Sequence, residues 1–184
     1  MFEHELKNAY IWKRPPEVLF NYWDWTNSTW TVRPNETQWT VTKTSTYVSF
    51  YNSSAYSQNY LSQYPIDWSK DFLLEMRAYM PSTNRGSHNI VIRSLDGTKS
   101  MWFGTDLTNY NIMKCWTEAG NVTWWGNPWT ADYFIRKEWT TVTIGRNNTT
   151  IYTNNNYTST AQYYLYEGVY NDTLTIFTAK LTYL

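Results

Sequence analysis

The chain has 184 residues, 42% of them hydrophobic, with 15 basic and 15 acidic side chains. This size and content fit one globular domain with a full core. The charges form no basic stripe of the kind that neutralises phosphates, which excludes the usual nucleic-acid binder. The apolar stretches are also far shorter than the ~20 residues of a spanning helix, so we expect no membrane insertion.

The composition favours strands over helices. Only 16% of the residues are charged, whereas 20% are aromatic. Thr, Tyr and Trp pack well on a half-buried pleated surface, and strong helix formers are sparse. The composition therefore predicts an all-β fold.

Residues 1–16 are expected to form a leader or connector. Pro15 and Pro16 lack backbone donors and favour extended geometry, which suits a domain edge. The first residues show neither the basic nor the apolar segment of a signal peptide. We therefore expect either a start inside a longer precursor or a protein that reaches the outside without secretion, as a virion component does. Residues 17–184 would form the domain.

Strand-like runs then alternate with turn signals about every ten residues, which is typical of a sandwich or barrel. The early runs are 28–32, 38–43 and 46–51, and 55–64 is expected to be a loop. The clearest strand is 71–80, where alternate positions form one apolar face. That face consists of Phe72, Leu74, Met76 and Ala78.

The later runs fall into hairpins. Segments 88–95 and 99–104 flank Asp96-Gly97, a strong type I′ turn signal. Another hairpin is expected from 111–118 and 121–125. A third pairs 138–145 with 149–153 across Arg146-Asn147-Asn148. Because the chain has only seven glycines, many turns are expected to use Asn in the left-handed region. The last run, 172–183, is expected to lie centrally in a sheet.

The order of these elements is recognisable. Asp24-Trp25 leads to Trp30-Thr31-Val32, followed by Trp39-Thr40-Val41 and Tyr47-Val48-Ser49-Phe50. A Phe-x-Leu-Glu-Met-Arg strand follows, and 139–144 leads into 149–153 before the final strand. This resembles the concanavalin A-like lectin/glucanase superfamily, including its laminin-G-like members. The resemblance covers 17–184 and implies a jelly roll of two curved antiparallel sheets, with ligands on the concave face or in rim loops.

The glucan-hydrolysing members of that superfamily carry a Glu-x-Asp-x-(x)-Glu strand motif. Retaining hydrolysis needs two carboxyls about 5–5.5 Å apart. Here Glu75 stands alone between Leu74 and Met76, and Asp71 would lie about 13 Å from it along a strand. We therefore expect no catalytic residues and no enzymatic activity.

The segment 116–133 concentrates aromatic and short polar side chains. Flat rings with a few amides or carboxylates suit the apolar faces and hydroxyl rims of sugars. Trp124 and Trp125 must point to opposite faces of one strand, so at most one is core. The alternatives are core packing or a protein interface. The candidate ligand-binding residues are Trp116, Trp124, Trp125, Asn127, Trp129, Asp132 and Tyr133, extended by Trp102 and Tyr110.

Metal and nucleophile chemistry has little support in the sequence. Cys115 is the single cysteine and the two histidines are His4 and His88, so no cysteine-based zinc cluster or serine triad is expected. Cys115 is expected to be a buried small hydrophobe. No cofactor is predicted; calcium stays an alternative, with oxygen ligands beside turns from Asp96, Asp106, Asp132 and Asp172.

Together these features predict a non-enzymatic carbohydrate-recognition domain. It would act as an adhesin or tail-fibre domain of a cell-surface or virion protein, outside the cell, with a surface glycan as partner. The first alternative is a structural module whose aromatics form the core and the contacts of a homo-oligomer or larger fibre. A glycoside hydrolase with an unusual carboxylate pair is the third reading.

Overall fold

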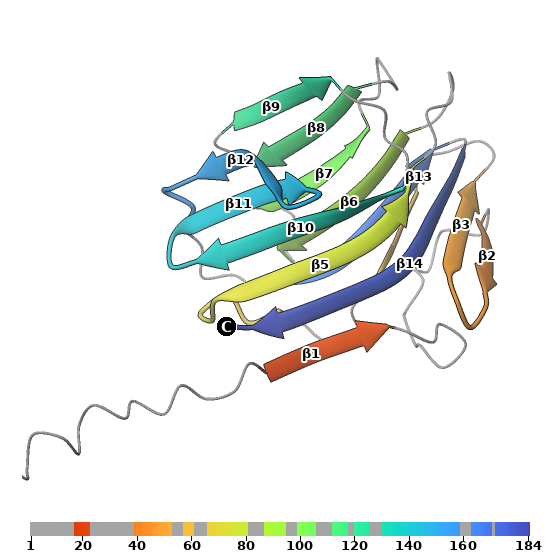
Figure 1. Cartoon of the computed structure of the whole chain (residues 1–184), viewed down its shortest axis with the longest axis horizontal. Helices are drawn as coiled ribbons and strands as arrows, with labels where there is room; N and C mark the ends of the chain where they lie inside the picture. The colour runs from red at the N-terminus through yellow and green to blue at the C-terminus, as the bar shows by residue number, and fades with distance from the viewer. Residues whose placement is uncertain are drawn as a thin grey trace, which may run out of the picture.

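The computed structural model describes residues 17–22, 39–52, 57–60, 66–80, 87–94, 99–105, 112–117, 120–125, 130–158, 163–170 and 172–184. These residues form strands and turns, with no helix among them (Figure 1). In chain order the strands are β1 (Glu17–Tyr22), β2 (Trp39–Lys43), β3 (Val48–Asn52), β4 (Ser57–Tyr60), β5 (Phe72–Tyr79), β6 (Ser87–Ser94), β7 (Ser100–Thr105), β8 (Ile112–Thr117), β9 (Gly120–Trp125), β10 (Ala131–Glu138), β11 (Thr141–Arg146), β12 (Thr149–Asn154), β13 (Tyr163–Tyr170) and β14 (Asp172–Tyr183).

Two antiparallel sheets form the two layers of the fold. The eight-stranded sheet has the order β12-β11-β10-β5-β14-β3-β2, with β1 also on β14. The six-stranded sheet has the order β4-β13-β6-β7-β8-β9. Figure 1 shows the first sheet in front of the second. This confirms the predicted all-β, two-sheet antiparallel sandwich.

The last strand, β14, organises the larger sheet, as predicted. One edge pairs with β5 over most of its length. The other edge pairs first with β3 and then with β1, so two short strands share it (Figure 1). A 12-residue strand can serve both because its rise of about 3.3 Å per residue gives it a length of about 40 Å.

The core lies between the sheets and follows the alternation of the strands. On β5 the positions of Phe72, Leu74, Met76 and Ala78 are all buried, as predicted. The six-stranded sheet supplies Ile90, Ile92, Met101 and Phe103 from the other side. Cys115 is buried beside them, which confirms its predicted role.

Several elements differ from the predictions. Strand β10 was not predicted, and β4 lies inside the expected loop 55–64. Trp139 was expected inside a strand but lies in a two-residue turn with Thr140, between the paired residues Glu138 and Thr141. The predicted run 28–32 and the leader 1–16 lie outside the described residues. No helix in the described part of the chain is long and apolar enough to cross a membrane.

Candidate functional site

The structure separates the predicted ligand residues onto different faces. Asp132 opens β10 on the outer face of the eight-stranded sheet. Trp102 lies on β7 between the buried Met101 and Phe103, so it points away from the core on the six-stranded sheet. The two cannot contact one ligand. Asn127, Trp129 and Tyr110 lie outside the described residues.

Tyr133 is a core residue, which corrects its predicted role as a ligand contact. Its ring is 3% exposed and stacks on Phe103, with the ring centroids 4.7 Å apart. Burial raises the pKa of the Tyr133 hydroxyl to about 12 and, likewise, that of the Cys115 thiol to about 12. Both groups therefore stay neutral near pH 7 and serve packing rather than proton transfer.

A row of residues crosses all six strands of the smaller sheet in register. Tyr60 pairs with Tyr166, Tyr166 with Val91, and Val91 with Trp102. The row continues from Trp102 to Trp116 and ends at Asn121. Strand spacings of about 4.8 Å make this row about 24 Å long. Four of its six positions are Tyr or Trp, and we call it the aromatic row.

The predicted tryptophans of β9 take opposite positions. Strand β9 pairs with β8, so that Trp124 is opposite Met113 and Trp125 is opposite Ile112. By alternation, position 125 lies on the face of the aromatic row and position 124 on the face of Cys115. By register, position 125 therefore shares a sheet face with positions 102 and 116.

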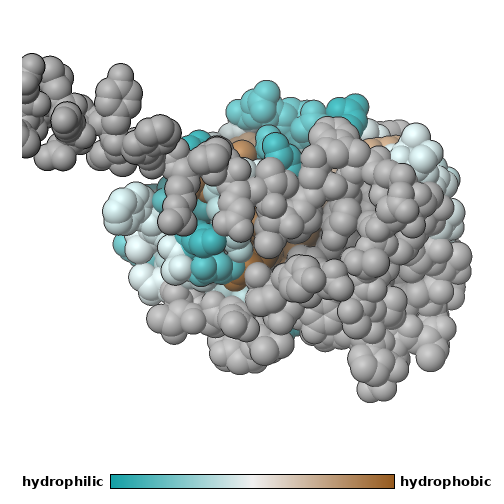
Figure 2. Space-filling model, turned by 90° about the horizontal axis from the view of Figure 1, so that it is seen from below, coloured by the Kyte–Doolittle hydropathy of each residue, from teal (hydrophilic) through white to brown (hydrophobic). Residues whose placement is uncertain are grey.

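The outer face of the larger sheet carries a depression of about 730 Å³. We call it the charged depression, because three of its residues are acidic and three are basic. Its lining residues are Leu73, Glu75, Met76, Arg77, Asp132, Tyr133, Phe134, Arg136, Glu138, Thr143, Asn148, Thr150, Thr178 and Lys180. Seen from below, the described surface is mainly hydrophilic, with hydrophobic atoms confined to small areas between polar residues (Figure 2).

Strand register fixes the carboxylates of this depression. Glu75 is directly opposite Phe134, two positions from Asp132 on β10. The backbone positions of Glu75 and Asp132 are therefore diagonal neighbours, about 7–8 Å apart. Asp132 is further held by Asn147, whose side-chain oxygen accepts from its backbone N–H at 3.1 Å.

The two carboxylates have different surroundings. Arg77 Nη1 donates to both oxygens of Asp132, at 3.1 and 3.3 Å. Glu75 is exposed and makes no hydrogen bond or ion pair with the described residues. Its carboxyl group, with Lys180 opposite it on β14, is therefore open to a ligand, whereas the Asp132 carboxylate is oriented by its arginine.

Phe134 supplies an apolar floor between these groups, and a glycine lets it do so. Its cross-strand partner is Gly145. A Cβ at that position would overlap the Phe134 ring and the Thr149 carbonyl oxygen. The absent side chain therefore allows the ring to lie across the strand.

Sequence reasoning missed the Glu75–Asp132 pair because it did not identify β10. A signal was present, since Tyr133 and Ile135 alternate with Asp132, Phe134 and Arg136 in a period of two. The pairing of β10 with β5 nevertheless joins segments far apart in the sequence, and no local pattern predicts such a pairing. No group of three or more metal-ligating side chains occurs among the described residues. Of the predicted calcium ligands, Asp96 and Asp106 lie outside them.

No protein-family model matches the sequence, and no curated protein matches it either. Solved structures do resemble it. The β-glucanase of Bacillus licheniformis has a TM-score of 0.65 at 10% identity, covering 90% of this chain and 97% of that one. The κ-carrageenase of Pseudoalteromonas carrageenovora, in complex with an oligotetrasaccharide of κ-carrageenan, has a TM-score of 0.67 at 8% identity, covering 96% and 98%. The laminarinase of Rhodothermus marinus has a TM-score of 0.62 at 9% identity, covering 92% and 98%.

These likenesses establish the fold, a concanavalin A-like jelly roll, as the resemblance implied. They contradict the prediction of a non-enzymatic recognition domain, because the three structures named above are glycan-processing enzymes; a carbohydrate-binding module of Bacillus subtilis is also similar, with a TM-score of 0.51 at 13% identity. The prediction that the chain is not an enzyme is contradicted by the same finding.

Proposed function

We propose that this chain is a polysaccharide-cleaving enzyme whose acid–base pair is Glu75 and Asp132 in the charged depression. One observation carries the proposal. A carboxyl group without a described partner and an arginine-held carboxylate line one depression, on strand positions that are diagonal neighbours about 7–8 Å apart along the backbone. Side chains from positions at this spacing can bring two carboxyls to the about 6.5–9.5 Å that inverting glycosidases use, which leaves room for a water molecule.

The two carboxyl groups would divide the work of an inverting glycosidase. Asp132, oriented by Arg77, takes a proton from a water molecule while the oxygen of that water bonds to the anomeric carbon. Glu75 gives its proton to the glycosidic oxygen as the old carbon–oxygen bond breaks. Phe134 lies directly opposite Glu75 and offers a sugar ring an apolar surface. The pair spans two strands, unlike the single-strand motif of glucan hydrolases.

Release of reducing ends from laminarin, mixed-linkage β-glucan and κ-carrageenan tests this function. We expect Glu75→Gln and Asp132→Asn to lose about 100-fold or more in rate. Asp67→Asn, which changes an exposed carboxylate outside the depression, should keep the wild-type rate. Proton NMR of the first product should show inverted anomeric configuration. Full activity in Glu75→Gln, or no cleavage of any of the three by the wild type, would count against the proposal.

The aromatic row is a second candidate surface for glycan contact. Its register favours this, since Trp102 and Trp116 are adjacent and position 125 shares their face. Stacking on such rings would bind an extended chain. Trp102→Ala should then raise the Kd for the same polysaccharides, whereas Glu75→Gln should leave that Kd unchanged. The reverse result would place the substrate in the charged depression alone.

We also propose that the chain acts outside the cell, on a cell surface or virion. An adhesin or tail-fibre setting and a homo-oligomeric assembly are part of this proposal. Uncharged Asn, Thr and Tyr-rich surfaces and a single cysteine support it. Immunogold labelling of intact cells and particles would check the location, and sedimentation would check the assembly.

A further inference from the structure

The turn between β10 and β11 holds an unusual residue. Trp139 has φ of 55°, the left-handed conformation, at the first of two central positions. Glycine is favoured at this position, because a Cβ there crowds the backbone. Strain of this kind persists where the surroundings enforce it, and it concentrates at functional sites.

The same tryptophan is the most exposed large hydrophobic side chain of the described residues, at 84%. Its indole therefore gains little from packing that would offset the strained backbone. Neighbouring exposed residues are polar: Glu138, Thr140, Asn155 and Thr158. The ring is thus a single flat apolar surface in a polar setting, and not part of a broad apolar patch.

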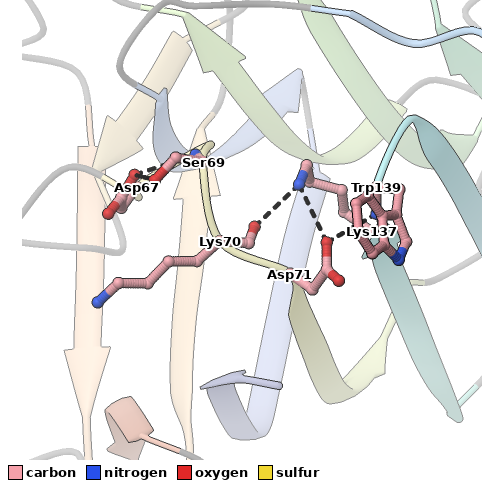
Figure 3. A network of polar contacts seen from close by, with 6 residues as sticks. All are labelled: Asp67, Ser69, Lys70, Asp71, Lys137 and Trp139. Carbon is pink, nitrogen blue, oxygen red and sulfur yellow. Dashed lines mark hydrogen bonds and ion pairs between the residues drawn. The ribbon is translucent and has the colours of Figure 1, made fainter.

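Two sets of hydrogen bonds hold the turn in this shape. Asp71 Oδ1 accepts from the backbone N–H of Trp139 at 2.7 Å and from Lys137 Nζ at 3.2 Å (Figure 3). The Thr140 carbonyl accepts from the backbone N–H of Tyr157 at 2.9 Å, and its hydroxyl donates to the Asn155 carbonyl at 3.1 Å. The Trp139-Thr140 turn is therefore held from both sides in the absence of a ligand.

Lys137 fixes Asp71 in turn. Its side chain is only 5% exposed, and its ammonium group also donates to the Lys70 carbonyl at 3.0 Å (Figure 3). The ammonium lies 5.5 Å from the ring centre of Trp68, a favourable cation–π distance. Trp68 itself stacks on Tyr163, with the ring centroids 4.3 Å apart. A buried charge held this way cannot shift easily.

A pocket of about 430 Å³ lies beside the turn. Its lining residues are Trp68, Ser69, Asp71, Lys137, Trp139, Thr140, Tyr157 and Thr158. Asp71 Oδ2 takes no hydrogen bond from the described residues, and its side chain is 30% exposed. The pocket therefore combines an exposed indole, an available carboxylate oxygen and several hydroxyl groups.

We propose that this pocket is a further glycan-binding site, which shares no lining residue with the charged depression or the aromatic row. One sugar ring would stack its apolar face on the Trp139 indole, and a hydroxyl group would donate to Asp71 Oδ2. A sugar fits better than a protein partner, because protein interfaces need a larger apolar core than one ring. The choice of a glycan as the ligand rests on the proposed function, but binding at this pocket does not require catalysis in the charged depression.

The position suits a polysaccharide that also reaches the charged depression. Trp139 follows Glu138, which lines that depression. Along β10, Trp139 lies seven residues from Asp132, or about 23 Å. A long chain could therefore occupy both sites, whereas a short oligosaccharide could not.

Affinity electrophoresis in gels containing laminarin, mixed-linkage β-glucan or κ-carrageenan tests the proposal. Trp139→Gly, which accepts the positive φ and should fold, is expected to raise the Kd for the retained polysaccharide about tenfold. Trp139→Phe keeps a stacking ring and should stay within a few-fold of the wild type. Tyr51→Ala removes another exposed ring, on β3, and serves as the matched control.

The two proposals fail in different ways. If Trp139→Gly binds as the wild type does, or the wild type is retarded by none of the three polysaccharides, the proposal of a glycan site at Trp139 is wrong. If Trp139→Gly alters the sedimentation coefficient and not the Kd, the indole is a subunit contact, and the proposal of a glycan site at Trp139 also fails. Loss of binding with unchanged cleavage of short oligosaccharides is the supporting result, and absence of cleavage alone would refute only the enzymatic proposal.

Discussion

Two successive turns of the β10–β11–β12 meander reverse the chain with different residues at positive φ. Each connects paired strands through two residues, Trp139-Thr140 in the first and Asn147-Asn148 in the second. The second has φ of 48° and 63°, the pattern of a type I′ turn, which Asn tolerates well. The first has only Trp139 at positive φ, where nothing in the side chain favours it.

The difference lies in what holds each turn. The second is local, since its own asparagines accept the conformation and Asn147 bonds back to Asp132. The first depends on Asp71, 68 residues away in the chain. A turn fixed by distant partners can present a residue that it would not otherwise hold. The second turn therefore serves the fold, whereas the first presents an exposed side chain.

The largest expected effect comes from removing the support of the first turn. Lys137→Met should destabilise the protein by about 2–4 kcal/mol, since it removes the cation that pairs with the Asp71 carboxylate and the donor to the Lys70 carbonyl. Urea unfolding would measure this, and the intrinsic fluorescence of the folded state should also change. A loss of less than about 0.5 kcal/mol would mean that Asp71 holds the turn without its ion pair to Lys137.

Gly145→Ala should have the next largest effect, close to the second turn. A Cβ there overlaps the Phe134 ring and the Thr149 carbonyl oxygen, and the carbonyl belongs to the backbone. We expect a loss of about 1–3 kcal/mol with displacement of Phe134 from the charged depression. Thermal unfolding would show the loss. Unchanged stability together with an unchanged cleavage rate would exclude the role given to Phe134.

The sequence predicted the second turn and not the first, for a physical reason. Asn tolerance of the left-handed region and the alternation of β5 are local, and both predictions were confirmed. The conformation of Trp139 depends on a bond to Asp71, and the Glu75–Asp132 pair on the register of β5 with β10. The predicted cluster of Asp132 with Trp102 was wrong because proximity in sequence does not tell which sheet a strand joins.

A direct comparison of the turns follows from glycine substitutions. Trp139→Gly should stabilise the protein by about 1 kcal/mol, because glycine adopts positive φ without the Cβ clash. Asn148→Gly should change stability by less than about 0.5 kcal/mol, because Asn already tolerates that region. Urea titrations of both variants and the wild type, with unchanged m-values, would measure these differences in the free energy of unfolding. Equal effects at both positions would show that Trp139 is not strained.

The smallest effect concerns the segment that leads into Asp71. Ser69 donates to Asp67 Oδ1 through its hydroxyl at 2.6 Å and its backbone N–H at 3.0 Å. The Ser69 hydroxyl is the main cause that lowers the pKa of Asp67 below its ordinary value of 3.8, with smaller help from Lys70 and Lys137. Because the folded pKa is depressed, this contribution is present above about pH 4 and is lost as the pH falls through the folded value. Asp67→Asn should therefore flatten the acid limb of a stability–pH curve slightly and leave stability at pH 7 to 9 parallel to the wild type. The exposed position of Asp67 keeps the effect small, and a steeper acid limb in the variant would contradict the assigned cause.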